Sequence, residues 1–182
     1  MADNLVKEMV NLISADSRSS IGLTGEFLNV KYAPDSAYSS DGNVFAHVFI
    51  ENRQGIYRAG LDAGVMDSNG DVESYLIPWD IVDTNIQLGV QYPMSIIYDA
   101  ATKTITLAIG TTERQYTFSD SVDIYPLNVC ESAGVRIDIS TREDEGEKTI
   151  ICEVDDVWVS ENYDFFLGPT CPKRPSMAPI YL

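Results

Sequence analysis

Residues 92–118, YPMSIIYDAATKTITLAIGTTERQYTF, decide the fold class. Apolar residues occupy every second position in two runs, at Met94, Ile96 and Tyr98 and then at Ile105, Leu107 and Ile109. A period of two is typical of β-strands that bury one face. Residues 99–103 and 110–112 are short and polar, as hairpin connections are. The segment therefore predicts three consecutive antiparallel strands.

Most of the remaining chain repeats this alternation. It predicts strands at 26–32, 44–51, 55–62, 72–77, 134–140 and 149–160, with 44–62 forming a hairpin and Pro78-Trp79-Asp80 a loop. In the last strand the apolar parity changes, which predicts a β-bulge near Asp155-Asp156. Because no strand–helix–strand pattern occurs, we expect an all-β fold, an antiparallel β-sandwich or jelly roll.

The N-terminal segment is the exception to this alternation. Its apolar residues follow i, i+3/i+4 spacing after Asp3, an N-cap residue type, and they are Leu5, Val6, Met9, Val10, Leu12 and Ile13. This spacing predicts a short N-terminal helix. The expected organisation is a helix and lead-in at 1–20, the β-sandwich at 21–167 and a Pro-rich C-terminal tail at 168–182.

Composition narrows the class of protein. Apolar residues make up 45% of the chain, as in globular proteins. No apolar run reaches the roughly 18 residues of a membrane-spanning helix, and residues 1–4 lack the basic start of a signal peptide, so neither is expected. Twelve basic against 28 acidic residues give a net charge of −16, which repels nucleic acid and anionic lipid. Solubility and divalent-cation binding both remain explanations of this acidity.

The three cysteines do not form a zinc motif. Cys130, Cys152 and Cys171 lack the paired spacing that zinc sites use. Cys130 and Cys152 lie at or within predicted strands, where two buried thiols and a disulfide between neighbouring strands are both compatible with the sequence.

Three short motifs carry a resemblance to a known family. They are Gly60-Leu61-Asp62, Pro78-Trp79-Asp80 and Tyr98-Asp99-Ala-Ala-Thr102-Lys103-Thr104-Ile105, followed by the closing strand Val154–Val159. In this order they resemble strands of legume lectins, and so the concanavalin A-like lectin/glucanase superfamily. The resemblance implies a β-sandwich, an extracellular or cell-surface protein and carbohydrate as ligand. It implies the fold more directly than the function, because this architecture also hosts enzymes and structural modules.

Two sites of that superfamily are not reproduced. Arg58 stands where legume lectins carry a metal-binding His, so their metal site is not expected. Laminarinase-type enzymes have an ExDxxE motif, and Trp158 occupies the position of its acid/base Glu. The chain therefore offers no recognisable carboxylate pair for glycoside hydrolysis.

One acidic turn is a candidate calcium site. Asp67, Asn69 and Asp71 place oxygen donors on alternate residues, as calcium loops do. An EF-hand loop would also need Gly at Val72 and Glu at Pro78. A polar β-turn explains the same residues equally well, so we expect either no cofactor or a structural calcium ion.

Four residues are candidate ligand-binding residues, namely Tyr57, Arg58, Tyr75 and Trp79. Exposed aromatic rings stack on the C–H faces of sugars, whereas a Trp that caps the core is the alternative interpretation. A catalytic alternative uses His47, the only histidine, or Tyr57 to move a proton while Arg58 neutralises a uronate. A partly buried His47 between Phe45 and Phe49 is the simpler interpretation.

The sequence thus predicts a non-catalytic binding module, with carbohydrate as the partner and neither nucleic acid nor membrane insertion. The alternatives are a polysaccharide-active enzyme, lyase or glycoside hydrolase, on the same fold and a structural or adhesive domain that binds protein. Oligomeric state stays open.

Overall fold

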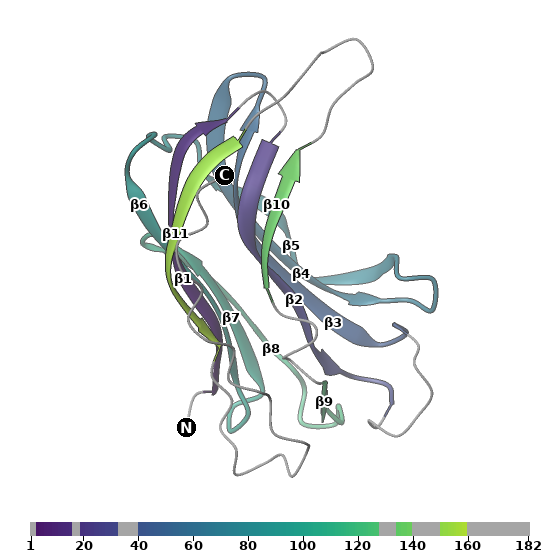
Figure 1. Ribbon diagram of the computed structural model, residues 1–182. Helices are drawn as coiled ribbons and strands as arrows, with labels where there is room; N and C mark the ends of the chain where they lie inside the picture. Colours follow the sequence, from purple (N-terminus) through teal and green to yellow (C-terminus); the bar gives the residue numbers. More distant parts are fainter. Residues whose placement is uncertain (1–2, 16–18, 33–39, 128–133, 140–149, 160–182) are drawn as a thin grey trace.

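Two antiparallel β-sheets packed against each other make up the fold (Figure 1). The computed structural model describes residues 3–15, 19–32, 40–127, 134–139 and 150–159. Within these ranges there are eleven strands and no helix. No described segment is a helix long and apolar enough to cross a membrane.

One sheet has five strands and the other six. The five-stranded sheet has the order β11 (Ile150–Val159), β1 (Asp3–Ala15), β6 (Gln91–Asp99), β7 (Thr104–Ile109) and β8 (Thr112–Thr117). The six-stranded sheet has the order β10 (Gly134–Ile139), β2 (Ser19–Asn29), β3 (Asn43–Arg53), β4 (Ile56–Met66) and β5 (Val72–Asp83), and β9 (Tyr125–Pro126) also pairs with β2. Each strand is therefore held by antiparallel neighbours.

The core lies between the sheets and is built by alternate residues of their facing strands. The predicted meander is confirmed, since Met94, Ile96, Tyr98, Ile105, Leu107 and Ile109 are all buried. Opposite them, Val44, Ala46, Val48 and Ile50 of β3 have no exposed surface, as their alternation predicted. Burying one Val, Leu, Ile or Met side chain of this kind contributes roughly 1.5–3 kcal/mol.

A two-residue turn fixes the register of the β3–β4 hairpin. Gln54 and Gly55 have φ angles of 59° and 84°, and Arg53 pairs with Ile56. Positive φ at both central residues is the geometry of a type I′ turn, whose twist matches that of the two strands. Every later pair along β3 and β4 follows from this turn.

The predicted N-terminal helix is wrong, because residues 3–15 form β1 between β6 and β11. The ladders of β1 shift register between Asn4 and Val6, between Lys7 and Met9, and between Leu12 and Ser14. After a register shift, odd-numbered positions take the face of the sheet that even-numbered positions had before it. Apolar residues then occur at both odd and even positions, and their spacing resembles that of an amphipathic helix. Tertiary pairing with two distant strands overrides that local pattern.

Two further expectations concern bulges. Pro78-Trp79-Asp80 is not a loop but lies inside β5, where three steps from Ile77 to Asp80 oppose two steps from Ala63 to Leu61. The bulge predicted near Asp155-Asp156 is confirmed, because Lys7 pairs with Trp158 and Met9 with Asp155. A bulge is one of the few places where a strand accommodates proline.

Several expectations fall on residues outside the described ranges. These are the Pro-rich tail at 168–182, Cys130 and Cys171. Cys152 lies in β11, but Cys130, its candidate disulfide partner, is outside the described ranges. Disulfide formation therefore stays an open prediction.

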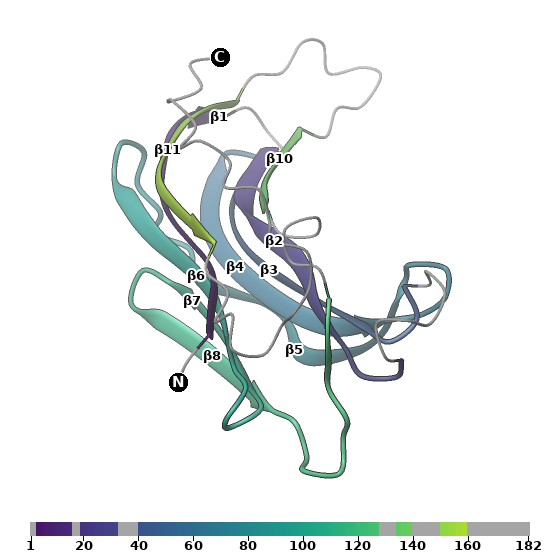
Figure 2. The same ribbon diagram turned by 60° about the horizontal axis from the view of Figure 1, so that its bottom comes forward.

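Strands β2, β3 and β4 are bent, with their convex side toward the five-stranded sheet (Figure 2). We call the opposite, concave side of the six-stranded sheet the outer face. It carries the side chains that alternate with the core residues.

Candidate functional site

Rows of paired residues cross the outer face. Residues directly opposite each other in the ladders are Gly22, Phe49 and Gly60 in one row, Thr24, His47 and Asp62 in the next, and Glu26, Phe45 and Gly64 in the third, while Glu51 pairs with Arg58 at the turn end. Directly opposed side chains lie about 5 Å apart at Cβ and interact. The outer face therefore alternates aromatic–glycine rows with polar rows.

Phe49 is the centre of this arrangement. Its ring lies over Gly60, where no Cβ competes for the space, and it is only 3% exposed although it does not belong to the core cluster between the sheets. The His47 ring stacks on it with centroids 4.6 Å apart, and the Trp79 ring lies nearly parallel to it at 6.3 Å. Three aromatic rings from β3 and β5 thus form one stacked series.

An ion pair flanks the ring series. Arg58 Nε donates to Glu51 Oε1 at 2.5 Å, and the two side chains are about one-fifth exposed. The guanidinium carbon of Arg58 also lies 5.6 Å from the centre of the Trp79 ring, within the range of a cation–π contact. Arg58 is therefore held by one carboxylate and one indole ring.

His47 lies beside a buried carboxylate that the sequence analysis did not single out. His47 Nδ1 is 3.5 Å from Asp62 Oδ1, and Asp62 is only 7% exposed. The signal for this contact was the Gln54-Gly55 turn, since its register places Asp62 directly opposite His47. Asp62 Oδ1 and Arg58 Nη2 are buried and have no hydrogen-bond partner among the described residues.

Two aromatic residues of the edge strand β5 remain accessible. Tyr75 is 52% and Trp79 47% exposed, so both predicted ligand-binding rings reach solvent. Tyr75 also makes an edge-to-face contact with Phe45, at 6.5 Å between ring centres. The bulge at Pro78 and Trp79 sets the position of the indole, because it shifts the parity of β5.

Tyr57 does not join this cluster. Adjacent residues of a strand point to opposite faces, and Tyr57 packs against the core while Arg58 lies on the outer face. Of the three residues in the catalytic alternative, the structure brings His47 and Arg58 to one face, on either side of Phe49, and leaves Tyr57 on the other.

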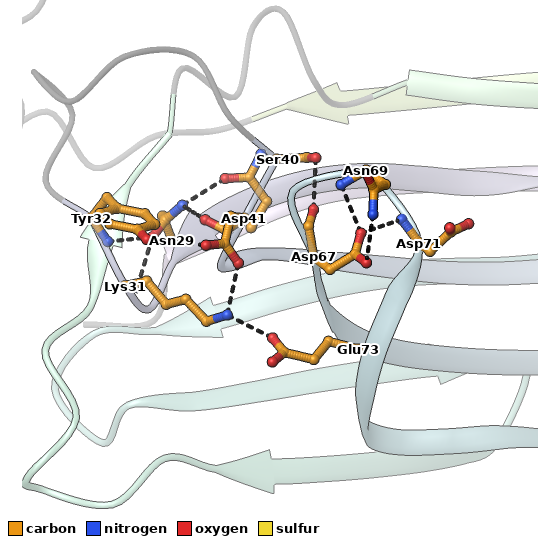
Figure 3. Close-up of polar contacts among 10 residues, drawn as sticks. Asn29, Lys31, Tyr32, Ser40, Asp41, Asp67, Asn69, Asp71 and Glu73 are labelled. Carbon is orange, nitrogen blue, oxygen red and sulfur yellow. Dashed lines mark hydrogen bonds and ion pairs between the residues drawn. The ribbon is translucent and has the colours of Figure 1, made fainter.

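The candidate calcium residues form a self-contained turn (Figure 3). Asp67 Oδ1 accepts hydrogen bonds from the backbone N–H groups of Asn69 and Asp71, at 2.8 and 3.0 Å. The bond from Asp71, which has the larger effect, and the bond from Asn69 hold the pKa of the Asp67 carboxyl below its ordinary value. Within the described ranges no three His, Cys, Asp or Glu side chains gather as a metal-binding group. The geometry therefore matches the polar β-turn interpretation.

A second polar network lies beside this turn. Lys31 Nζ donates to Asp41 Oδ1 and Glu73 Oε2, each at 2.7 Å, and Tyr32 donates its hydroxyl to Asp41 (Figure 3). The bond to Asp41, followed by that to Glu73, raises the pKa of Lys31 above its ordinary value. The bond from Lys31 likewise lowers the pKa of Asp41. The network ties the ends of β2, β3 and β5 together.

Comparison with known proteins adds no assignment. No protein-family model, no curated protein and no solved structure matches the chain. The outer face is therefore the part of the molecule from which its function is inferred.

Proposed function

We propose that this protein is a non-catalytic carbohydrate-binding module with a concanavalin A-like β-sandwich fold. The observation that carries the proposal is the pair of exposed rings on the outer face, Tyr75 against Phe45 and Trp79 against Phe49 and Arg58. Sugars present C–H faces that stack on aromatic rings and hydroxyl groups that exchange hydrogen bonds with ionised side chains. Binding sites with this combination of aromatic surface and few polar groups are typical of small-molecule recognition.

The test is a thermal-unfolding screen of the full chain against soluble neutral and acidic glycans, with calcium and again with chelator. A ligand that binds only the folded state raises the melting temperature. Trp79→Ala should abolish the shift without loss of the fold. The matched control is Leu88→Ala, which removes an exposed apolar side chain of the β5–β6 connection. No shift with any glycan would move the assignment to the protein-binding alternative.

A polysaccharide-active enzyme is the second candidate, favoured by the contact of His47 with the buried Asp62. A carboxylate beside a His orients the ring, as a general base requires. Incubation of a bound glycan with the protein, followed by chromatography, tests for cleavage products. Cleavage that is lost in His47→Ala while binding persists would replace the non-catalytic assignment.

A further inference from the structure

We infer that the outer face takes a neutral, extended glycan of several sugar units, in preference to an acidic glycan or a single sugar. This inference rests on the proposed function and narrows its ligand. Two observations carry it, the charge balance of the face and the positions of its exposed rings.

The charge balance disfavours an anionic ligand. The rows across β2, β3 and β4 hold three carboxylates, Glu26, Glu51 and Asp62, and one guanidinium, Arg58. Arg58 already has Glu51 as its counter-ion at 2.5 Å, so its charge is neutralised. The chain as a whole carries a net charge of −16. The rows continue onto β10, where Arg136 pairs with Gly22 and Asp138 with Ser20 and so add one charge of each sign. A uronate or sulfate group would therefore meet an excess of negative charge across the sheet.

The unsatisfied polar atoms suit hydroxyl groups. Asp62 Oδ1 and Arg58 Nη2 are buried and make no hydrogen bond with the described residues, and leaving such buried groups unpaired is unfavourable. A hydroxyl group can serve either atom, since it both donates and accepts. Both atoms are covered in the free protein. His47 Nδ1 is 3.5 Å from Asp62 Oδ1, and the Trp79 ring centre is 5.6 Å from the guanidinium carbon of Arg58. A ligand that shifts these rings would satisfy both atoms.

The distance between the two exposed rings requires a ligand longer than one sugar unit. Tyr75 contacts Phe45 and Trp79 contacts Phe49. Phe45 and Phe49 lie four residues apart on β3, which pairs with β4 without a register shift, and this separation is roughly 13 Å at about 3.3 Å per residue. One pyranose ring cannot touch both side chains. An extended oligosaccharide that lies along β5 can stack on each of them.

The experiment is isothermal titration of the full chain with cellohexaose and mannohexaose, with glucose and cellobiose, and with a galacturonate hexamer. At least one neutral hexamer should bind about tenfold or more tightly than the short sugars and than the galacturonate hexamer. Tyr75→Ala should lower the affinity for the hexamer more than the affinity for the disaccharide. Glu51→Gln, which removes the counter-charge of Arg58 and keeps an acceptor for its Nε, should raise the affinity for galacturonate. Circular dichroism checks that both variants remain folded.

The possible failures are distinct. Tighter binding of galacturonate by the unmodified protein would overturn the preference for neutral glycans while leaving carbohydrate binding intact. Equal affinity for glucose and the hexamers would contradict the inference that the ligand is extended. Absence of binding to all five probes would refute this inference, and if the wider glycan screen is also negative, the proposed function fails with it.

Discussion

Phe49 lies over Gly60, its direct partner in the β3–β4 ladder, and occupies the space that a Cβ at residue 60 would need. A methyl group there would clash with Phe49 Cζ and lie 2.9 Å from the Asp80 carbonyl oxygen. We expect Gly60→Ala to destabilise the protein by about 1–3 kcal/mol, the usual cost of overpacking. Urea denaturation measures it.

Gly22 provides the comparison. It faces the same Phe49 from β2, but a Cβ there would meet backbone, the Val48 carbonyl oxygen and Phe49 Cα. Backbone atoms cannot rotate away, so Gly22→Ala should cost more than Gly60→Ala. A Phe49→Leu background should reduce the cost at Gly60 and leave most of the cost at Gly22. Equal relief at both positions would contradict this account of the packing.

The Glu51–Arg58 pair should show strong coupling. Each side chain is about four-fifths buried, so removing one leaves the other as a poorly solvated charge. Glu51→Ala and Arg58→Ala should each cost about 1–3 kcal/mol. The double variant should cost less than the sum, with a coupling energy of roughly 0.5–3 kcal/mol in a double-mutant cycle. Additive costs would show that the pair contributes nothing beyond two separate side chains.

The sequence predicted those parts of the fold that depend on local alternation. Leu107 and its neighbours in the meander keep one parity over each strand, so the pattern identified both the strands and their buried face. Residues 3–15 could not be read in this way, because their bulges are set by pairing with β6 and β11. Local spacing carries no information about partners that lie far along the chain.

The same limit applies to the candidate site. Trp79 and Arg58 were singled out, and the fold brings them together. Asp62 was missed because its role depends on register, which follows from the positive-φ turn at Gln54 and Gly55. Tyr57 was grouped with Arg58 by closeness in sequence, although strand alternation separates them.

The core should respond to truncation as a tightly packed layer. Leu107 is fully buried, and Leu107→Ala should lower the free energy of unfolding by about 2–5 kcal/mol through lost burial and the cavity left behind. The adjacent Thr106 is the matched control, since it faces away from the core and its replacement by Ala should cost about 0.5 kcal/mol or less. Equal losses of unfolding free energy at the two positions would contradict the assignment of Leu107 to the buried face of β7 and of Thr106 to the opposite face.

Acid should weaken the β4–β5 turn before it weakens the core. Backbone N–H groups of Asp71 and Asn69 lower the pKa of Asp67, and Lys31 lowers that of Asp41. For a lowered pKa the unfolded chain takes up protons first, so this stabilisation is present above the ordinary Asp pKa of about 3.9 and is lost as the pH falls through the folded-state value. Melting temperature measured from pH 7 downward should therefore fall steeply below about pH 4.

Asp67→Asn isolates the contribution of this turn. The amide oxygen still accepts from the two backbone N–H groups but cannot be protonated in this range, so the variant should melt slightly lower at neutral pH and lose stability less steeply in acid. Asp123→Asn, at an exposed position after β8, removes one carboxylate without touching the turn and is the control. If both variants change the fall of the melting temperature with pH to the same extent, the effect comes from net charge. The hydrogen bonds to Asp67 would then not determine the loss of stability in acid.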